Sequence, residues 1–391
     1  MKIKLLTAVL LAASGLLAAC GKQTAETPAA PAPEEQTPES GPAAENIPLE
    51  MDPVFRSTNA KISREEMEAL GFEFGDSLTL SFSTGLVLDD IPYHDGYYVK
   101  PGNPVAVSYP GLPDLNIALN LGDGSWDVYG FQEGDTVSVR LKEKGRYLNE
   151  QKTFAQSHSD DINDYESAET FANFRSLSGG EVAPDLIYRS ATMTNNSMNR
   201  ADVVDDLSEQ YGIKTVLDYS DTEESLAGFR AMDSWNSDYF DALYEKGSAH
   251  VLGLGVNPAS EEFHKDLSQA LYGMILEEGP YLFFCTEGKD RTGYCAALIE
   301  ALCGATYDEM LADYMLTYEN YYGMTKESAP EQCRAAIDTS FDPIMRIMFE
   351  VNDDEDLAAA SYEERARQFL REGGLTDAQI DEMHRVFTGA R

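Results

Sequence analysis

The most informative stretch of this sequence places one cysteine six positions before one arginine, with glycines between and after them. Residues 285–293 read Cys-Thr-Glu-Gly-Lys-Asp-Arg-Thr-Gly and directly follow the apolar run Tyr281–Phe284. A loop whose backbone N–H groups point inward, and which opens into a helix N-terminus, supplies positive potential to a thiolate and to a bound anion. The stretch therefore predicts a phosphate-binding loop with a nucleophile at its base.

The residue types indicate what such a loop could do. Cys285 would attack the phosphorus of a monoester and hold it as a phosphocysteine, which water then hydrolyses. The planar fork of Arg291 can grip two oxygens of the transferring group, whereas a lysine offers only a point charge. Glycines allow the tight turns, and the threonine after the arginine can donate its hydroxyl to the sulfur. The loop residues expected to hold the phosphate are Thr286, Glu287, Gly288, Lys289, Thr292 and Gly293.

This run resembles the C-x5-R-[ST] signature of cysteine-based protein tyrosine phosphatases, and its Gly-Lys-Asp-Arg-Thr-Gly form is similar to the bacterial branch of tyrosine and lipid phosphatases. Segments 173–175, 188–191 and 215–218 are also similar to that branch, so the likeness covers roughly residues 160–391. It implies an α/β fold with a phosphatase-like sheet flanked by helices. It also implies a hydrolase acting on phosphotyrosine protein, phosphoinositide or soluble inositol phosphate.

The sequence departs from the resemblance at two places. Phe284 stands where the family usually has a histidine that tunes the thiol, and Tyr219-Ser220 follows Asp218 where the family usually has Leu-Arg. The first change removes a polar group beside the nucleophile, and the second removes a cation near the pocket. An alternative hypothesis is therefore a surface lipoprotein that binds a phosphate ligand with weak or no turnover.

A general acid must protonate the leaving oxygen. The resemblance implies Asp290 for this role. The residues themselves leave Asp218 and Asp221 as alternative acids, because both follow an apolar strand whose end should face the mouth of the loop. Lys289 could bind a second phosphate, as in phosphatases that accept inositol lipids, or could be an ordinary surface lysine.

The N-terminus resembles a bacterial lipoprotein signal. Lys2 and Lys4 precede an apolar run from Leu5 to Ala19, which ends in small residues before Cys20. This implies a signal peptide over 1–19, lipidation of Cys20 and a lipid anchor on the extracytoplasmic face of the membrane. A secretory peptide or a short membrane anchor are the alternatives, and both also place the chain outside the cytoplasm. Residues 20–49 are rich in Pro, Ala and Glu and predict a disordered tether.

The charge and the cysteine content of the chain limit the kinds of partner and cofactor that it is expected to bind. With 29 basic and 68 acidic residues the formal net charge is −39, so nucleic acid and anionic lipid surfaces are repelled, and membrane contact is expected through the anchor only. Phosphate must be attracted by the local field of the loop, within a Debye length of about 8 Å. No Cys/His cluster has metal-ligand spacing, and the mechanism requires no metal or cofactor. Buried free thiols are expected at Cys295, Cys303 and Cys333, although a Cys303–Cys333 disulfide is conceivable.

Residues 50–155 predict a small all-β module that precedes the catalytic domain at 156–391. Short runs in which apolar residues alternate with polar ones are separated by turn residues. Segments 71–80 and 130–139 have similar sequences, and each predicts a turn followed by a strand. A helix is predicted from Ser63, where Glu66 completes a capping box. The module could bind cell wall or the catalytic domain, which makes an adhesion protein the third functional hypothesis. Residues 151–169 are expected to be a connector with a little strand.

Strands and helices alternate in the catalytic domain, which favours an α/β sheet. The predicted strands cover 186–189, 215–218, 249–254 and 281–284, and the predicted helices cover 260–277, 294–302 and 308–322. Capping boxes are expected at Thr306 with Glu309, Ser361 with Glu364 and Thr376 with Gln379. The helix over 308–322 could be a lid over the pocket, or could pack on the sheet.

Overall fold

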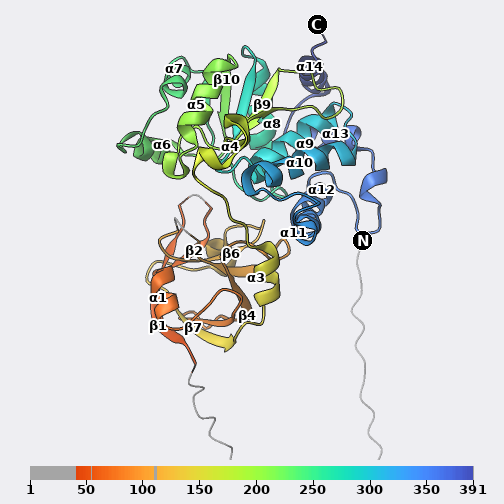
Figure 1. Ribbon diagram of the computed structural model, residues 1–391. Helices are drawn as coiled ribbons and strands as arrows, with labels where there is room; N and C mark the ends of the chain where they lie inside the picture. Colours follow the sequence, from red (N-terminus) through yellow and green to blue (C-terminus); the bar gives the residue numbers. More distant parts are fainter. Residues whose placement is uncertain (1–40, 54, 110–111, 391) are drawn as a thin grey trace, which may run out of the picture. The chain divides into compact units, whose positions relative to one another are not determined.

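The computed structural model describes residues 41–53, 55–109 and 112–390 (Figure 1). The predicted signal peptide, the lipidation site Cys20 and most of the predicted tether lie outside these residues. The predicted end of the tether at residue 49 is wrong, because strand β1 already spans Ala43–Met51. Ile47 and Leu49 alternate with exposed neighbours and bury their side chains, which a tether could not do. Among the described helices none is long and apolar enough to cross a membrane.

The β region forms a closed barrel with strand order β1-β2-β6-β5-β4-β3-β7. Its remaining strands are β2 (Thr58–Ala60), β3 (Ser77–Phe82), β4 (Val87–His94), β5 (Pro104–Val107), β6 (Leu115–Leu119) and β7 (Thr136–Glu143). Pairing of β1 with β7 closes the barrel, so that each of its described strands has a neighbour on both sides. Three short helices accompany it: α1 (Arg64–Ala69), α2 (Ser125–Tyr129) and α3 (Leu148–Phe154). The capping box between Ser63 and Glu66 is confirmed.

The similar segments 71–80 and 130–139 of the barrel have the same local structure. Asp76 accepts a hydrogen bond from Glu73 N at 2.8 Å, and Asp135 accepts one from Gln132 N at 2.9 Å. Each of these turns then leads into a strand, β3 or β7, and the two strands pair antiparallel. The two similar segments therefore lie side by side in the barrel wall. Their equivalent residues Leu80 and Val139 pair with each other, which relates the two strands by an approximate local twofold axis.

The region predicted to be catalytic contains a five-stranded sheet with order β11-β10-β12-β9-β8. Its strands are β8 (Arg175–Ser176), β9 (Ile187–Ser190), β10 (Thr215–Asp218), β11 (Ala249–Val251) and β12 (Tyr281–Phe284). The neighbours of β10 and β12 run parallel to them, and only β8 is antiparallel. Pairing of Asp218 with Phe284, and of Phe284 with Ser190, aligns the carboxyl ends of three strands at one edge. The loop after β12 therefore starts where ligands bind in open α/β sheets.

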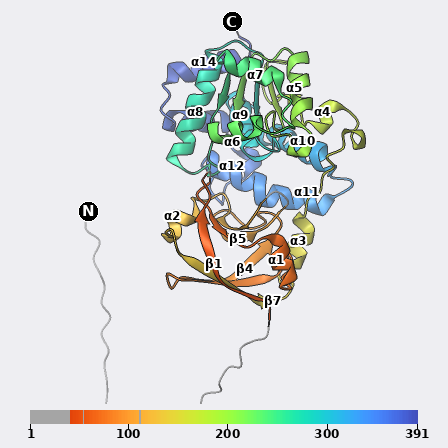
Figure 2. The ribbon, with the colours of Figure 1, turned by 90° about the vertical axis from the view of Figure 1, so that its left-hand side faces the viewer.

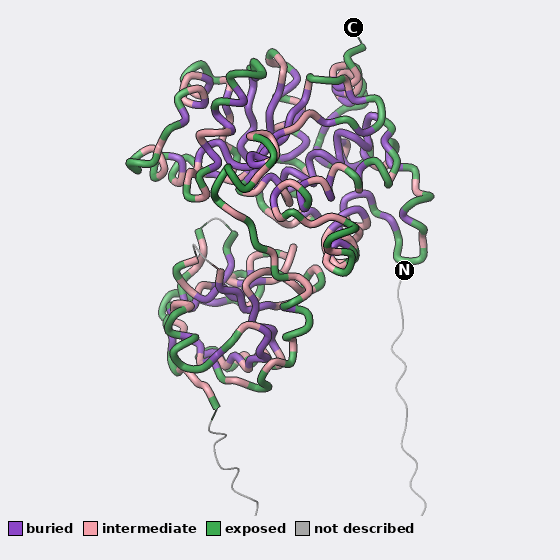
Figure 3. The backbone as a smooth tube through the Cα atoms, viewed as in Figure 1, coloured by how far each residue is buried: buried purple, intermediate pink, exposed green. Residues whose placement is uncertain are grey.

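Helices cover both faces of this sheet, which confirms the predicted α/β class. The helices are α4 (Ala168–Phe171), α5 (Ala201–Gln210), α6 (Glu223–Arg230), α7 (Asp238–Glu245), α8 (Glu261–Ile275), α9 (Asp290–Leu302), α10 (Tyr307–Tyr322), α11 (Pro330–Ala336), α12 (Asp342–Met348), α13 (Tyr362–Glu372) and α14 (Asp377–Phe387). Leu217 and Phe283 face a core built with helices α8, α9 and α13, whereas Val216 and Leu282 face a second core built with α5 and α7. Figure 2 shows α5 and α8 on opposite sides of the strands, and Figure 3 shows the strands as the buried centre of this region.

The predicted strands and helices differ from the structure mainly at their ends. Strand β11 stops at Val251 rather than 254, because the chain leaves the sheet toward Gly253, whose φ is +54°. Helix α9 begins at Asp290 rather than 294, so the loop arginine belongs to its first turn. The connector contains short helices instead of a strand, since Asp161 and Ser167 cap helical turns.

Two of the three C-terminal capping boxes are confirmed. Thr306 and Thr376 accept from the backbone three residues on, whereas Ser361 makes no such bond and its predicted box is wrong. Helix α10 buries Met310, Tyr314 and Met315 in the larger core, which favours packing over the role of a lid. The described cysteines are all buried and free: Cys285, Cys295, Cys303 and Cys333.

Candidate active site

Three consecutive carbonyl groups of the loop after β12 are hydrogen-bonded away from its centre. Thr286 O accepts from Thr192 N at 3.1 Å, Glu287 O accepts from Asn173 Nδ2 at 3.2 Å, and Gly288 O accepts from Arg189 Nη2 at 2.6 Å. In a planar trans peptide the N–H of the next residue points opposite to the carbonyl. The N–H groups of residues 287, 288 and 289 are therefore turned inward, which is the arrangement that binds an anion.

The side chains that hold these carbonyls form one buried network. Arg189 on β9 is fully buried and bonds to Asp313 on α10, and Asp313 also accepts from Arg175 Nε at 2.8 Å. Burial alone would raise the pKa of Asp313, but Arg175 and Arg189 outweigh it and lower that pKa. Arg175 Nη1 donates to Asn173 Oδ1 at 2.5 Å, which fixes the amide of Asn173 with its N–H₂ toward the loop. This network is the part of the site to which sequence reasoning gave no role.

The loop glycines stand where a side chain would collide. Gly288 has φ +70°, and a Cβ there would lie 2.2 Å from Ser190 O. A Cβ on Gly293 would lie 2.9 Å from the ring of Tyr314. The first glycine allows the close approach of the loop to the end of β9, and the second allows α9 to lie directly against α10.

Cys285 begins the loop directly after β12, and Thr292 lies in the first turn of α9. Cys285 is 4% exposed. Thr292 is fully buried, and its hydroxyl bonds to no described residue. A bond from this hydroxyl to the sulfur stays a prediction. Phe284, which replaces the expected histidine, is buried in the smaller core and brings no polar group to the thiol.

Arg291 is positioned by backbone from two other segments. Its Nη1 donates to Tyr219 O at 3.1 Å and to Leu254 O at 3.3 Å, and the residue is 7% exposed. Both hydrogen bonds that Arg291 donates to described residues use this one nitrogen. The other N–H groups of the fork stay available for phosphate oxygens.

The three acidic candidates have different surroundings. Asp290 begins α9 and is partly exposed, and burial of its carboxyl group raises its pKa above the ordinary value. Asp218 is fully buried, and its Oδ1 accepts three hydrogen bonds from Ser220 and Asp221. Burial and the neighbouring Asp221 raise the pKa of Asp218 well above the ordinary value. Asp221, 7% exposed, accepts a bond from Thr194.

These surroundings favour Asp290 as the proton donor without testing it. Its carboxyl group alone combines partial exposure at the loop with a raised pKa, while Asp218 orders the turn that follows β10. The choice among the three acids stays a prediction.

Two remaining loop residues form an ion pair. Lys289 Nζ lies 2.9 Å from Glu287 Oε2, and the two side chains are 15% and 29% exposed. Tyr322 on α10 bonds to both of them. The predicted role of Lys289 in binding a second phosphate would require this ion pair to open.

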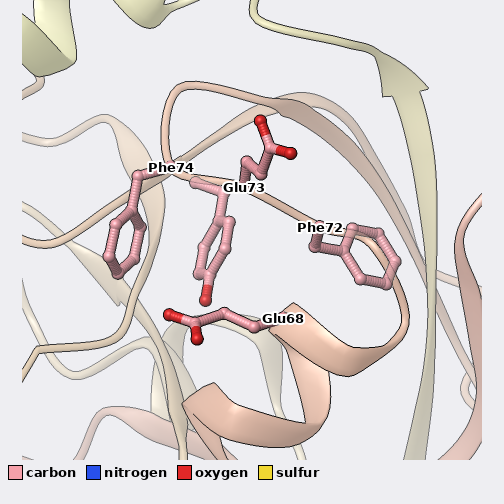
Figure 4. A pocket seen from close by; sticks show the side chains of 5 residues that line it. Glu68, Phe72, Glu73 and Phe74 are labelled. Carbon is pink, nitrogen blue, oxygen red and sulfur yellow. The ribbon is translucent and has the colours of Figure 1, made fainter.

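Two hollows in the described part of the chain are lined by residues other than those of the loop. One of about 180 Å³ is lined by Glu68, Phe72, Glu73, Phe74 and Tyr93 of the barrel (Figure 4). Another of about 460 Å³ has Asp338, Asp342 and Arg346 in its wall, near α12. Within the described residues no group of His, Cys, Asp and Glu could hold a metal ion.

Comparison with known proteins gives one extended match. Residues 167–389 match the tyrosine phosphatase family. A tyrosine-protein phosphatase of Nostoc commune is 33% identical over 106 residues, which is 27% of this chain and 33% of that protein. The aligned segment thus spans about a third of the curated relative.

Two solved structures are similar at a greater distance. The core catalytic domain of the PP-IP phosphatase Siw14 from S. cerevisiae, in complex with citrate, is 22% identical. That likeness covers 46% of this chain and 92% of the other, with a TM-score of 0.26. TpbA from P. aeruginosa is 16% identical, covering 55% of this chain and 91% of that one, with a TM-score of 0.22.

Replacement of Gly288 by alanine should distort the loop. The positive φ and the collision with Ser190 O together predict a loss of about 3 kcal/mol in the free energy of unfolding. Gly304 is the matched control, because its φ is +80° but no atom lies within 4 Å of its Cβ position. Gly304→Ala should cost only about 1 kcal/mol in urea unfolding. Equal losses in the two variants would show that the close approach to β9 carries no strain.

Proposed function

Because the chain belongs to the tyrosine phosphatase family, we propose that it hydrolyses phosphomonoesters through a phosphocysteine intermediate on Cys285. The single observation that carries the proposal is the set of outward hydrogen bonds on the carbonyls of residues 286–288, which turns the N–H groups of residues 287–289 inward in the loop that begins with Cys285. The substrates proposed are phosphotyrosine proteins, phosphoinositides or both. The chemistry needs no cofactor, because sulfur, backbone and side chains supply every step.

The first step transfers the phosphoryl group to sulfur. The inward amides and the fork of Arg291 hold the three equatorial oxygens, whose charge is spread in a loose transition state. The Cys285 thiolate bonds to phosphorus as the ester P–O bond breaks, and Asp290 gives its proton to the departing oxygen. In the second step water attacks phosphorus, the P–S bond breaks, and Asp290 accepts a proton from the water.

The N-terminal sequence supports a lipid-anchored, extracytoplasmic protein. Anchoring through Cys20 would leave the catalytic region outside the cytoplasm. Expression in a bacterium fed a labelled fatty acid should label the chain, and Cys20→Ala should remove the label. Label that persists in Cys20→Ala would exclude this anchor.

The nucleophile can be tested on a generic aryl phosphate. Cys285→Ser should lower kcat for 4-nitrophenyl phosphate by at least about 10⁴-fold, because a serine hydroxyl is not ionised near neutral pH. Cys333→Ala is the matched control, since this buried free thiol lies on α11 and should leave kcat within about twofold.

Vanadate should inhibit the wild-type enzyme, since it mimics the phosphoryl group under attack. Tight vanadate or phosphate binding with no Cys285-dependent turnover would instead support the alternative, a phosphate-binding lipoprotein. Phe284 in place of the histidine is the observation that favours this alternative.

The proton donor can be tested by pH. The acid must be protonated to act, and the raised pKa of Asp290 keeps it protonated to a higher pH than an ordinary aspartate. Activity should therefore fall as pH rises through that pKa, which gives the basic limb of a bell-shaped kcat/KM profile. Asp290→Asn should flatten this limb and lower kcat by about 10²-fold or more for phenyl phosphate, which has a poor leaving group.

The loss for 4-nitrophenyl phosphate should be smaller, since its leaving group needs less protonation. Asp221→Asn is the matched control and should keep the basic limb. An intact limb in Asp290→Asn together with a lost limb in Asp221→Asn would reassign the acid to Asp221.

A further inference from the structure

The loop after β12 contains a lysine whose charge is neutralised by an ion pair with a carboxylate of the same loop. Lys289 Nζ lies 2.9 Å from Glu287 Oε2 and donates to the hydroxyl of Tyr322 at 3.1 Å. That hydroxyl in turn donates to Glu287 Oε2 at 2.7 Å. The three groups form a closed triangle of hydrogen bonds, and the ammonium also donates to Gln156 Oε1 at 3.4 Å, so it is held by three partners.

Helix α10 positions this triangle. Tyr318 and Tyr322 are four residues apart and lie on one face of the helix. Their ring centroids are 6.0 and 5.3 Å from Lys289 Nζ, within the range of a cation–π contact. The ammonium therefore sits between the Glu287 carboxylate and the aromatic face of α10, and only 15% of the lysine side chain is exposed.

The charges of the pair are stable near neutral pH. Burial alone would lower the pKa of Lys289, but Glu287, Tyr322, Asp290 and Tyr318 together outweigh burial and raise that pKa well above the ordinary value. Burial alone would raise the pKa of Glu287, but Lys289, Tyr322 and His158 together outweigh burial and lower it. The two residues therefore contribute no net charge to the loop, and Arg291 with the inward amides provides its attraction for phosphate.

We propose that Glu287 is a specificity-determining residue that neutralises Lys289 and so excludes substrates with a second phosphate beside the one that is cleaved. The inference rests on the proposed phosphatase function. A neighbouring phosphate would have to displace the Glu287 carboxylate from the ammonium, and it would be repelled by that carboxylate until it did. The substrates that fit are esters with a single phosphate, on tyrosine or on an otherwise unphosphorylated inositol ring.

Two soluble probes that differ by one vicinal phosphate provide the test. These are inositol 4-phosphate and inositol 4,5-bisphosphate, with release of the 4-phosphate measured as kcat/KM on the full chain. The wild-type enzyme should prefer the monophosphate. Glu287→Gln leaves Lys289 unpaired and should raise the bisphosphate-to-monophosphate ratio of kcat/KM by about tenfold, the order expected when one like charge beside the ligand is removed. The ratio is internal to each variant, so a loss of folded protein does not move it.

Two matched variants separate charge from packing. Tyr322→Phe removes the hydroxyl but keeps both charges, so the ratio should stay within about twofold of wild type. Glu278→Gln removes a carboxylate from the exposed pair with Lys214 and should also leave the ratio unchanged, because Glu278 precedes β12 whereas the loop follows the carboxyl end of that strand.

The outcomes distinguish this inference from the proposed function. An unchanged ratio in Glu287→Gln, or a wild-type enzyme that prefers the bisphosphate, would overturn the inference while Cys285-dependent turnover still supported a phosphatase. Turnover that survives Cys285→Ser would overturn the proposed function itself.

Discussion

The outward hydrogen bonds of three loop carbonyls are the constraint on which the rest of the site depends. A peptide unit is rigid, so fixing each carbonyl fixes the direction of the next N–H. The bonds come from Asn173, Arg189 and the backbone of Thr192, which belong to segments well before the loop. The geometry that would receive the phosphate is thus imposed from outside, and the loop needs no bound ligand to adopt it.

This arrangement requires Arg189 and Arg175 to be buried, and a carboxylate compensates their charge. Arg189 and Arg175 share the Asp313 carboxylate, because a buried guanidinium without a partner would be strongly destabilising. Lys289 is compensated by Glu287 at the surface of the loop. The positive potential that remains comes from Arg291 and from oriented amides, and it acts over a short range in a chain whose formal net charge is −39.

Sequence reasoning located the loop, both strands β10 and β12, and most of the capping boxes, because these depend on residues close together in the chain. It gave no role to the network behind the loop, since Arg189 and Asp313 are 124 positions apart. One signal was present: an arginine inside the buried strand β9 needs a carboxylate partner. Ser361 has the spacing of a capping box but lacks its hydrogen bond, so spacing alone does not decide such a bond. The start of β1 was missed because a strand with exposed residues between Ala44 and Ile47 has the composition of a tether.

The place of Asp313 on α10 has a consequence for folding. A chain that ends with α9 already contains the nucleophile, both glycines and Arg291, yet it lacks the carboxylate that lets Arg189 be buried. Wherever the chain folds, the loop should therefore reach its anion-binding geometry only after the α10 segment has docked. The buried sulfur and the oriented amides would come together late in folding, as one of the last steps rather than a nucleus.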